Sequence, residues 1–106
     1  MKLLLDECVT RDIQADFVGH QVHTVEEAGL KGLENGDLLK AAAGSYDVLI
    51  TVVQNIPYQQ NVSALSISIL ILVAKRNSYV RLKPLIPRAL SALDSITPGT
   101  VVRIEA

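Results

Sequence analysis

Three consecutive leucines end in two acids in the run Lys2-Leu3-Leu4-Leu5-Asp6-Glu7. A short, continuously apolar run, without the alternation of a half-exposed strand, is typical of a parallel strand that is covered on both faces. Two longer runs, at residues 48–53 and 66–73, have the same aliphatic character. We therefore expect a sheet whose central strands are buried between two layers of helices.

The segments between these runs carry helix signals. Thr10 is a candidate N-cap for a helix to about Gly19, with Ile13, Phe17 and Val18 on one face. Asn35 and Ser78 are candidate N-caps for two further helices, the first of which runs to about residue 43. Two further strands are expected at residues 21–25 and 100–105.

Strands thus alternate with helices along residues 1–106, which we interpret as a single domain. This order predicts an α/β fold: an open, mostly parallel five-stranded sheet with helices on both faces. We expect right-handed crossovers throughout. The carboxyl ends of the strands then lie along one edge, where open α/β sheets bind their ligands.

Composition and cysteine content bound the class of protein. Hydrophobic residues make up 49% of the chain but aromatic residues only 4%, so the core is expected to be aliphatic. The single cysteine excludes an internal disulfide and favours a reducing compartment, so we expect a cytoplasmic protein. The longest apolar stretch, residues 65–74, is about half as long as a bilayer span, so no membrane segment is expected.

Charge is distributed unevenly along the chain. Residues 1–47 contain nine acids and four bases, whereas residues 48–106 contain two acids and six bases. This asymmetry predicts an acidic site beside a basic flank, although chance alone produces such a split in a short chain.

The acids that follow the predicted strands are the candidate catalytic residues. Asp6 and Glu7 directly follow the first strand, and Asp37 lies in the first turn of the helix that begins near Asn35. Carboxylates gathered at one sheet edge suit Mg²⁺ or Mn²⁺, which activates water in phosphodiester hydrolysis. The plainer alternatives are a solvated strand end for Asp6 and Glu7 and a helix-dipole interaction for Asp37.

Two segments are candidates for RNA binding. The segment 55–61 is polar but uncharged, and its amides and tyrosine suit nucleobases. Residues 75–88 contain five bases and no acid, which suits phosphate contacts. The candidate RNA-binding residues are Asn55, Tyr58, Gln59, Gln60, Arg76 and Arg81. A polar loop and a solvated helix face are the ordinary alternatives.

Short motifs in a fixed order extend over nearly the whole chain. They are Lys2-Leu3-Leu4-Leu5-Asp6-Glu7-Cys8-Val9, Thr24-Val25, Asn35-Gly36-Asp37-Leu38-Leu39, Asn55-Ile56-Pro57-Tyr58-Gln59-Gln60-Asn61 and Pro98-Gly99. Together they resemble small prokaryotic PIN-like proteins, which are related to the VapC-type toxins of toxin–antitoxin systems.

The resemblance implies a PIN-like fold and a metal-dependent endoribonuclease. Asp6, Glu7 and Asp37 match the family's catalytic acids, with Asp6 and Asp37 as ligands of Mg²⁺ or Mn²⁺. The implied partners are an antitoxin protein and an RNA substrate, and a homodimer is compatible with the resemblance.

The chain departs from the family pattern at position 53. It reads Thr51-Val52-Val53-Gln54-Asn55, where the family pattern resembles Thr-Val-Asp-Gln-Asn. Valine offers no oxygen to a metal ion, so the resemblance implies weak metal binding and impaired activity in this chain. A smaller departure is Leu30, where the pattern often shows tryptophan.

Two other functions compete with an active nuclease. One is a catalytically inactive PIN-like module that binds an antitoxin or RNA, which Val53 favours. The other is a receiver-like signalling domain, which requires a phosphoacceptor aspartate at the end of the third strand. The segment Thr51-Val52-Val53 contains no such residue.

Overall fold

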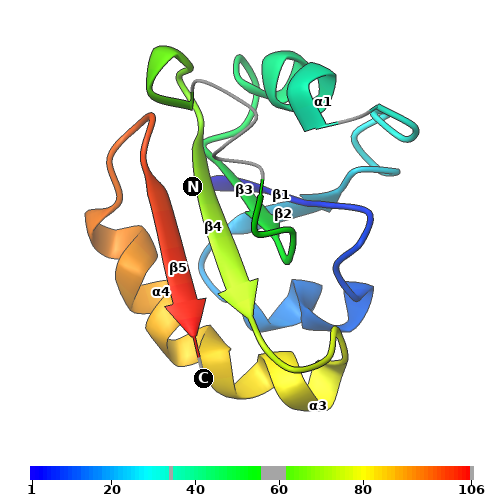
Figure 1. Cartoon of the computed structure of the whole chain (residues 1–106), viewed down its shortest axis with the longest axis vertical. Coiled ribbons are helices and arrows are strands. Elements are labelled where there is room, and N and C mark those ends of the chain that lie inside the picture. The colour runs from blue at the N-terminus through cyan, green and yellow to red at the C-terminus, as the bar shows by residue number, and fades with distance from the viewer. Residues whose placement is uncertain (34, 56–61, 106) are drawn as a thin grey trace.

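The computed structural model describes residues 1–33, 35–55 and 62–105. Within them, five parallel strands form one sheet in the order β2-β1-β3-β4-β5 (Figure 1). The strands are β1 (Lys2–Leu5), β2 (Gln21–Thr24), β3 (Val48–Thr51), β4 (Ser68–Val73) and β5 (Val101–Glu105). The predicted α/β fold with a parallel sheet is confirmed.

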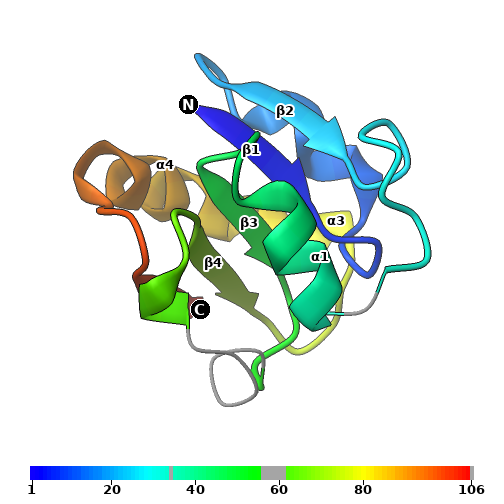
Figure 2. The same cartoon turned by 90° about the horizontal axis from the view of Figure 1, so that it is seen from above.

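Helices cover both faces of the sheet (Figure 2). The elements are η1 (Arg11–Asp16), α1 (Asn35–Ala42), η2 (Val62–Ala64), α3 (Tyr79–Leu82), η3 (Lys83–Leu85) and α4 (Ile86–Ser95). Successive side chains of a strand point to opposite faces, so the leucines of β1 divide between two cores. Leu3 and Leu5 pack with η1, α3, η3 and α4, whereas Leu4 packs with α1 and η2.

The β4–β5 crossover departs from the expected uniform hand. It runs through α3 and α4 on the same face of the sheet as η1, which connects β1 to β2. Both connections lie on this one face, but β1–β2 moves toward the β2 edge of the sheet and β4–β5 moves toward the β5 edge. The two connections therefore have opposite hands. The β2–β3 connection through α1 lies on the other face and has the same hand as β1–β2. Our expectation of right-handed crossovers throughout is therefore wrong for β4–β5.

Burial explains this exception. The six-residue η1 contributes Ile13 to the core on its face. The helices α3 to α4 contribute most of the remaining cover there, through Leu82, Leu85, Ile86, Ala89 and Leu93. Placing them on this face covers Leu70 and Leu72 of β4, which are fully buried, and apolar burial outweighs the preference of a single connection.

The predicted first helix is shorter and tighter than its sequence pattern suggested. Residues 11–16 form a 3-10 helix, and Thr10 makes no side-chain capping hydrogen bond. Phe17 is buried, with 1% of its surface exposed, whereas Val18 is 69% exposed and does not share its face. Ser78 likewise precedes α3 without a side-chain cap.

A reciprocal pair of hydrogen bonds shapes the turn after β2. The Thr24 amide donates to Glu27 Oε1 at 2.8 Å, and the Glu27 amide donates to Thr24 Oγ1 at 3.1 Å, which forms a capping box. The Gln14 side chain also donates to Glu27 Oε1, at 2.8 Å. The Thr24 amide, with help from Gln14, lowers the pKa of Glu27 below its ordinary value.

Of the helices that the described ranges contain, none has the length and apolar content to cross a membrane.

Candidate functional site

Asp6 lies at the crevice between β1 and β3, on the carboxyl edge of the sheet. The Asp6 amide extends the strand pairing by donating to the Ile50 carbonyl at 3.0 Å. In the strand order 2-1-3-4-5 the chain leaves β1 and β3 toward opposite faces, so this crevice is the switch point where doubly wound sheets bind ligands. The Asp6 side chain is half-buried there.

Thr51 holds the Asp6 carboxylate in place. Thr51 is fully buried at the end of β3, and its hydroxyl donates to Asp6 Oδ2 at 2.8 Å. The same hydroxyl oxygen accepts from the Val53 amide at 3.1 Å. Asp6 Oδ1 accepts from the Glu7 amide at 2.8 Å. The carboxylate is therefore fixed through both oxygens before any ligand arrives.

Sequence reasoning missed Thr51. The only local signal was a polar residue at the end of an apolar strand. Its partner Asp6 lies 45 positions away in the chain.

We expect Thr51→Val to lower the free energy of unfolding by about 1–2 kcal/mol. Valine has nearly the same shape, but it leaves Asp6 Oδ2 and the Val53 amide without the hydroxyl. Thr51→Ser keeps the hydroxyl and is the matched control, with a smaller loss. Urea unfolding of the three proteins measures the effect. Equal losses for both variants would contradict a dominant contribution from the hydroxyl, because Thr51→Ser keeps it.

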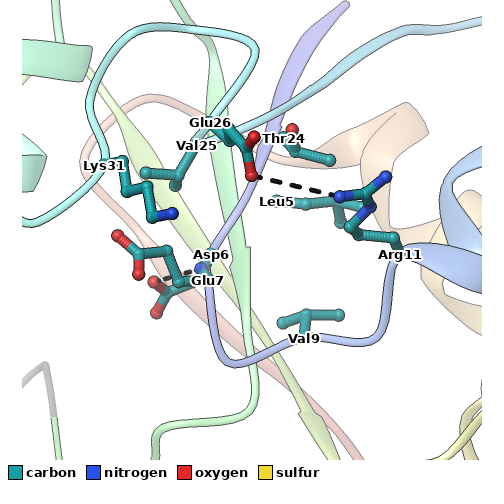
Figure 3. A pocket seen from close by; sticks show the side chains of 9 residues that line it. All are labelled: Leu5, Asp6, Glu7, Val9, Arg11, Thr24, Val25, Glu26 and Lys31. Carbon is teal, nitrogen blue, oxygen red and sulfur yellow. Dashed lines mark hydrogen bonds and ion pairs between the residues drawn. The ribbon is translucent and has the colours of Figure 1, made fainter.

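Glu7 forms one wall of a cavity of about 140 Å³ at the ends of β1 and β2. Glu7 is exposed, and its Oε1 accepts from the Gly32 amide at 2.7 Å. The Lys31 side chain points toward the side of the cavity that Asp6 and Glu7 line (Figure 3). On the opposite side, Arg11 and Glu26 form an exposed ion pair at 4.0 Å.

The third candidate acid, Asp37, lies on a different element. It is exposed in the first turn of α1, which begins near the carboxyl ends of the strands (Figure 2). In residues 1–33, 35–55 and 62–105, no three His, Cys, Asp or Glu side chains form a group that could hold a metal ion. Asp6 and Glu7 are adjacent in the chain, whereas Asp37 is on α1, and the described residues do not gather these three acids into one metal-binding group.

Val53 lies just past the end of β3 and is half-buried. Its side chain packs against the core on the α1 face, whereas the side chain of Val52 packs against the core on the opposite face. Position 53 therefore lies on the side of the sheet that α1 covers, and Asp37 is in the first turn of α1.

The candidate RNA-binding residues are only partly described. Asn55 is exposed beyond β3, whereas Tyr58, Gln59 and Gln60 lie outside the described residues. Arg76 is exposed and lines a hollow of about 170 Å³ at the ends of β3 and β4, together with Gln54, Lys75 and Asn77. Arg81 lies further from this edge, in α3.

Cys8 is exposed as a residue, but its Sγ donates to Asp6 Oδ2 at 3.5 Å and lies 3.7 Å from Thr51 Oγ1. Partial burial of the sulfur, and next the charge of Asp6, raise the pKa of the Cys8 thiol above its ordinary value. The thiolate fraction at neutral pH is therefore below that of a free cysteine, which argues against a nucleophilic role.

We expect iodoacetamide to alkylate Cys8 several-fold more slowly than free cysteine at pH near 7. The rate should rise with pH beyond the range where free cysteine levels off, because the pKa is raised. Asp6→Asn removes the neighbouring charge and should increase the rate, as followed by mass spectrometry. A rate equal to that of free cysteine at every pH would contradict this environment.

Searches against protein-family models, curated proteins and solved structures found no match to this chain.

Proposed function

We propose that this chain is a PIN-like domain of the toxin–antitoxin type. It has the fold of a metal-dependent endoribonuclease, but its metal site lacks one carboxylate ligand, at Val53. The observation that carries the proposal is the Asp6 carboxylate, held by Thr51 and the Glu7 amide at the crevice between β1 and β3. Carboxylates fixed in advance at such an edge are what phosphodiester hydrolysis with a hard cation requires.

The residues present supply part of a ligand set for Mg²⁺ or Mn²⁺. Asp6 and Asp37 are the proposed ligands, with Glu7 beside Asp6. The ion, when bound, activates water and stabilises charge on the phosphate. Val53 supplies no oxygen on the α1 side, and its side chain packs into the apolar core there. We therefore propose weak metal binding and little RNA cleavage by the chain with valine at position 53.

Charge at the same edge supports an RNA substrate. The hollow at the ends of β3 and β4 is lined by Lys75, Arg76, Gln54 and Asn77. The Asn77 amide already hydrogen-bonds to backbone groups of Thr10 and Cys8, so the proposed RNA contacts depend on the two bases. Bases of this kind bind the phosphate backbone of RNA, and amides bind sugars and bases. We propose, from their side-chain chemistry alone, that Asn55, Tyr58, Gln59 and Gln60 also bind RNA. A cytoplasmic location and an antitoxin partner complete the proposal.

An inactive RNA- or antitoxin-binding module is the second candidate, and Val53 favours it. The receiver-like alternative is weakened by topology. In receiver-like sheets all crossovers are right-handed, which places the β4–β5 helix on the face opposite the β1–β2 helix. In this chain α4 and η1 share one face.

The test is cleavage of a mixed RNA pool by the chain and by Val53→Asp, with Mn²⁺ and with EDTA. EDTA-sensitive cleavage that is much faster in the variant supports the nuclease proposal. Equal, EDTA-sensitive cleavage by both would show that position 53 is not a ligand. Salt-sensitive RNA binding without cleavage by either folded protein supports the binding module instead.

A further inference from the structure

A groove on the α3–α4 side of the molecule borders the hollow proposed for RNA and shares Ala74 and Lys75 with it, but its other lining residues do not line that hollow. It has a volume of about 440 Å³ and extends from the end of β4 along α3, η3 and the start of α4. Its lining includes the apolar residues Val80, Pro84 and Leu85 and the bases Lys75, Arg81 and Arg88.

The apolar part of the groove is unusually accessible. Val80 is 77% exposed, the largest exposure among the exposed large hydrophobic residues of the described chain, and Pro84 is also exposed. Leu85 is buried and forms the floor. A single exposed aliphatic residue is ordinary, but a concave surface that combines several is typical of a binding site.

The rim of the groove is positively charged and lacks counterions. Within the described ranges the ion pairs are Arg11–Glu26 and Arg103–Glu105, so no carboxylate there neutralises Lys75, Arg81 or Arg88. Among the residues that the structure describes, no acid lines the groove. Arg88 is also fixed in position, because its guanidinium donates to the carbonyl oxygen of Glu105 at the end of β5.

We propose that this groove binds a peptide segment of a partner protein that presents aliphatic side chains flanked by carboxylates. Charge complementarity selects the carboxylates, and the apolar floor selects the aliphatic groups. RNA fits less well. None of the described residues that line the groove is aromatic and could stack on a base, and contacts to phosphate alone would leave the apolar floor exposed to water. The proposal does not depend on the nuclease activity.

The probe is a short fluorescein-labelled peptide composed of Glu and Leu, titrated with the full chain and followed by anisotropy. Comparison peptides replace Glu with Lys, or Leu with Ser, and a single-stranded RNA is the nucleic-acid probe. Of the three peptides we expect only the Glu–Leu peptide to bind. RNA that binds at the hollow lined by Arg76 should bind Arg81→Glu as well as the unchanged chain. Arg81→Glu should weaken binding of the Glu–Leu peptide about tenfold or more, because it places like charges in contact. Val80→Ser should weaken it about threefold through lost apolar contact.

Lys40→Glu is the matched control, because it reverses an exposed base on α1, on the other face of the sheet. It should leave peptide affinity unchanged, and circular dichroism checks that all variants fold. Equal weakening by Lys40→Glu, or no binding of the Glu–Leu peptide, overturns the proposal. RNA binding that Arg81→Glu weakens and Val80→Ser does not would assign the groove to nucleic acid. Self-association in sedimentation that Arg81→Glu abolishes would assign it to a second copy.

Discussion

Val53→Asp is expected to increase Mn²⁺-dependent RNA cleavage by about 10²–10³-fold, by analogy with the loss caused by removing one preorganised hydrogen-bond donor from an enzyme. The substitution adds a carboxylate just past the end of β3, on the face where α1 begins with Asp37. Asp6, already held by Thr51, lies at the end of the neighbouring strand. Mn²⁺ affinity should rise together with cleavage, because both require the added oxygen ligand.

The substitution also has a cost in stability. Val53 is half-buried and packs against the core on the α1 face, so its replacement by a charged residue should lower the free energy of unfolding by about 1 kcal/mol. A domain of this kind is stable by about 5–15 kcal/mol, so the variant should still fold. Thermal unfolding with and without Mn²⁺ checks both points, because a bound ion should offset part of the loss.

Val52→Asp is the matched control for this experiment. It makes the same chemical change one residue earlier, at a half-buried valine that packs against the opposite face of the sheet. We expect no gain in cleavage or Mn²⁺ affinity from it. Adding Asp6→Asn to Val53→Asp should abolish the gain. Cleavage by Val52→Asp equal to that of Val53→Asp would contradict a position-specific ligand and point to a contaminating nuclease.

Phe17→Ala is expected to lower the free energy of unfolding by about 3–5 kcal/mol, the largest stability effect that we predict. Phe17 is the single phenylalanine of the chain and is 1% exposed in the core beneath η1. Removal of its ring leaves a cavity among aliphatic side chains that fill it only partly. This loss is a large share of the stability of a domain of this size.

Val18→Ala is the control, because Val18 is the next residue and is 69% exposed. Its free energy of unfolding should change by no more than about 0.5 kcal/mol. Urea unfolding of both variants therefore tests the 3-10 geometry of η1. A loss of more than about 1 kcal/mol from Val18→Ala would instead support the amphipathic helix that the sequence pattern suggested, with Val18 on its buried face.

Local patterns in the sequence were sufficient to predict the sheet. The aliphatic runs at β1, β3 and β4 predict buried strands, because only a strand covered on both faces requires side chains without alternation. The helical segments between these runs predict a parallel sheet. Because Asp6 and Glu7 directly follow β1, they are predicted to lie at the carboxyl edge of that sheet. These properties depend on residues that are close together in the chain.

The tertiary structure alone decided which residues meet at that edge and which face each connection takes. The bond between Thr51 and Asp6 joins β3 to β1, and no local pattern specifies such a pair. Phe17 and Val18 are adjacent apolar residues just after η1. Phe17 is buried and Val18 is exposed, and the sequence pattern does not distinguish them. The position of α4 on the η1 face depends on apolar side chains of β4, such as Leu70 and Leu72, that would otherwise be exposed on that face. The position of α4 and the burial of Phe17 remove apolar surface from water, and the hydrogen bond to Asp6 satisfies the buried Thr51 hydroxyl. Both depend on residues that are far apart in the chain.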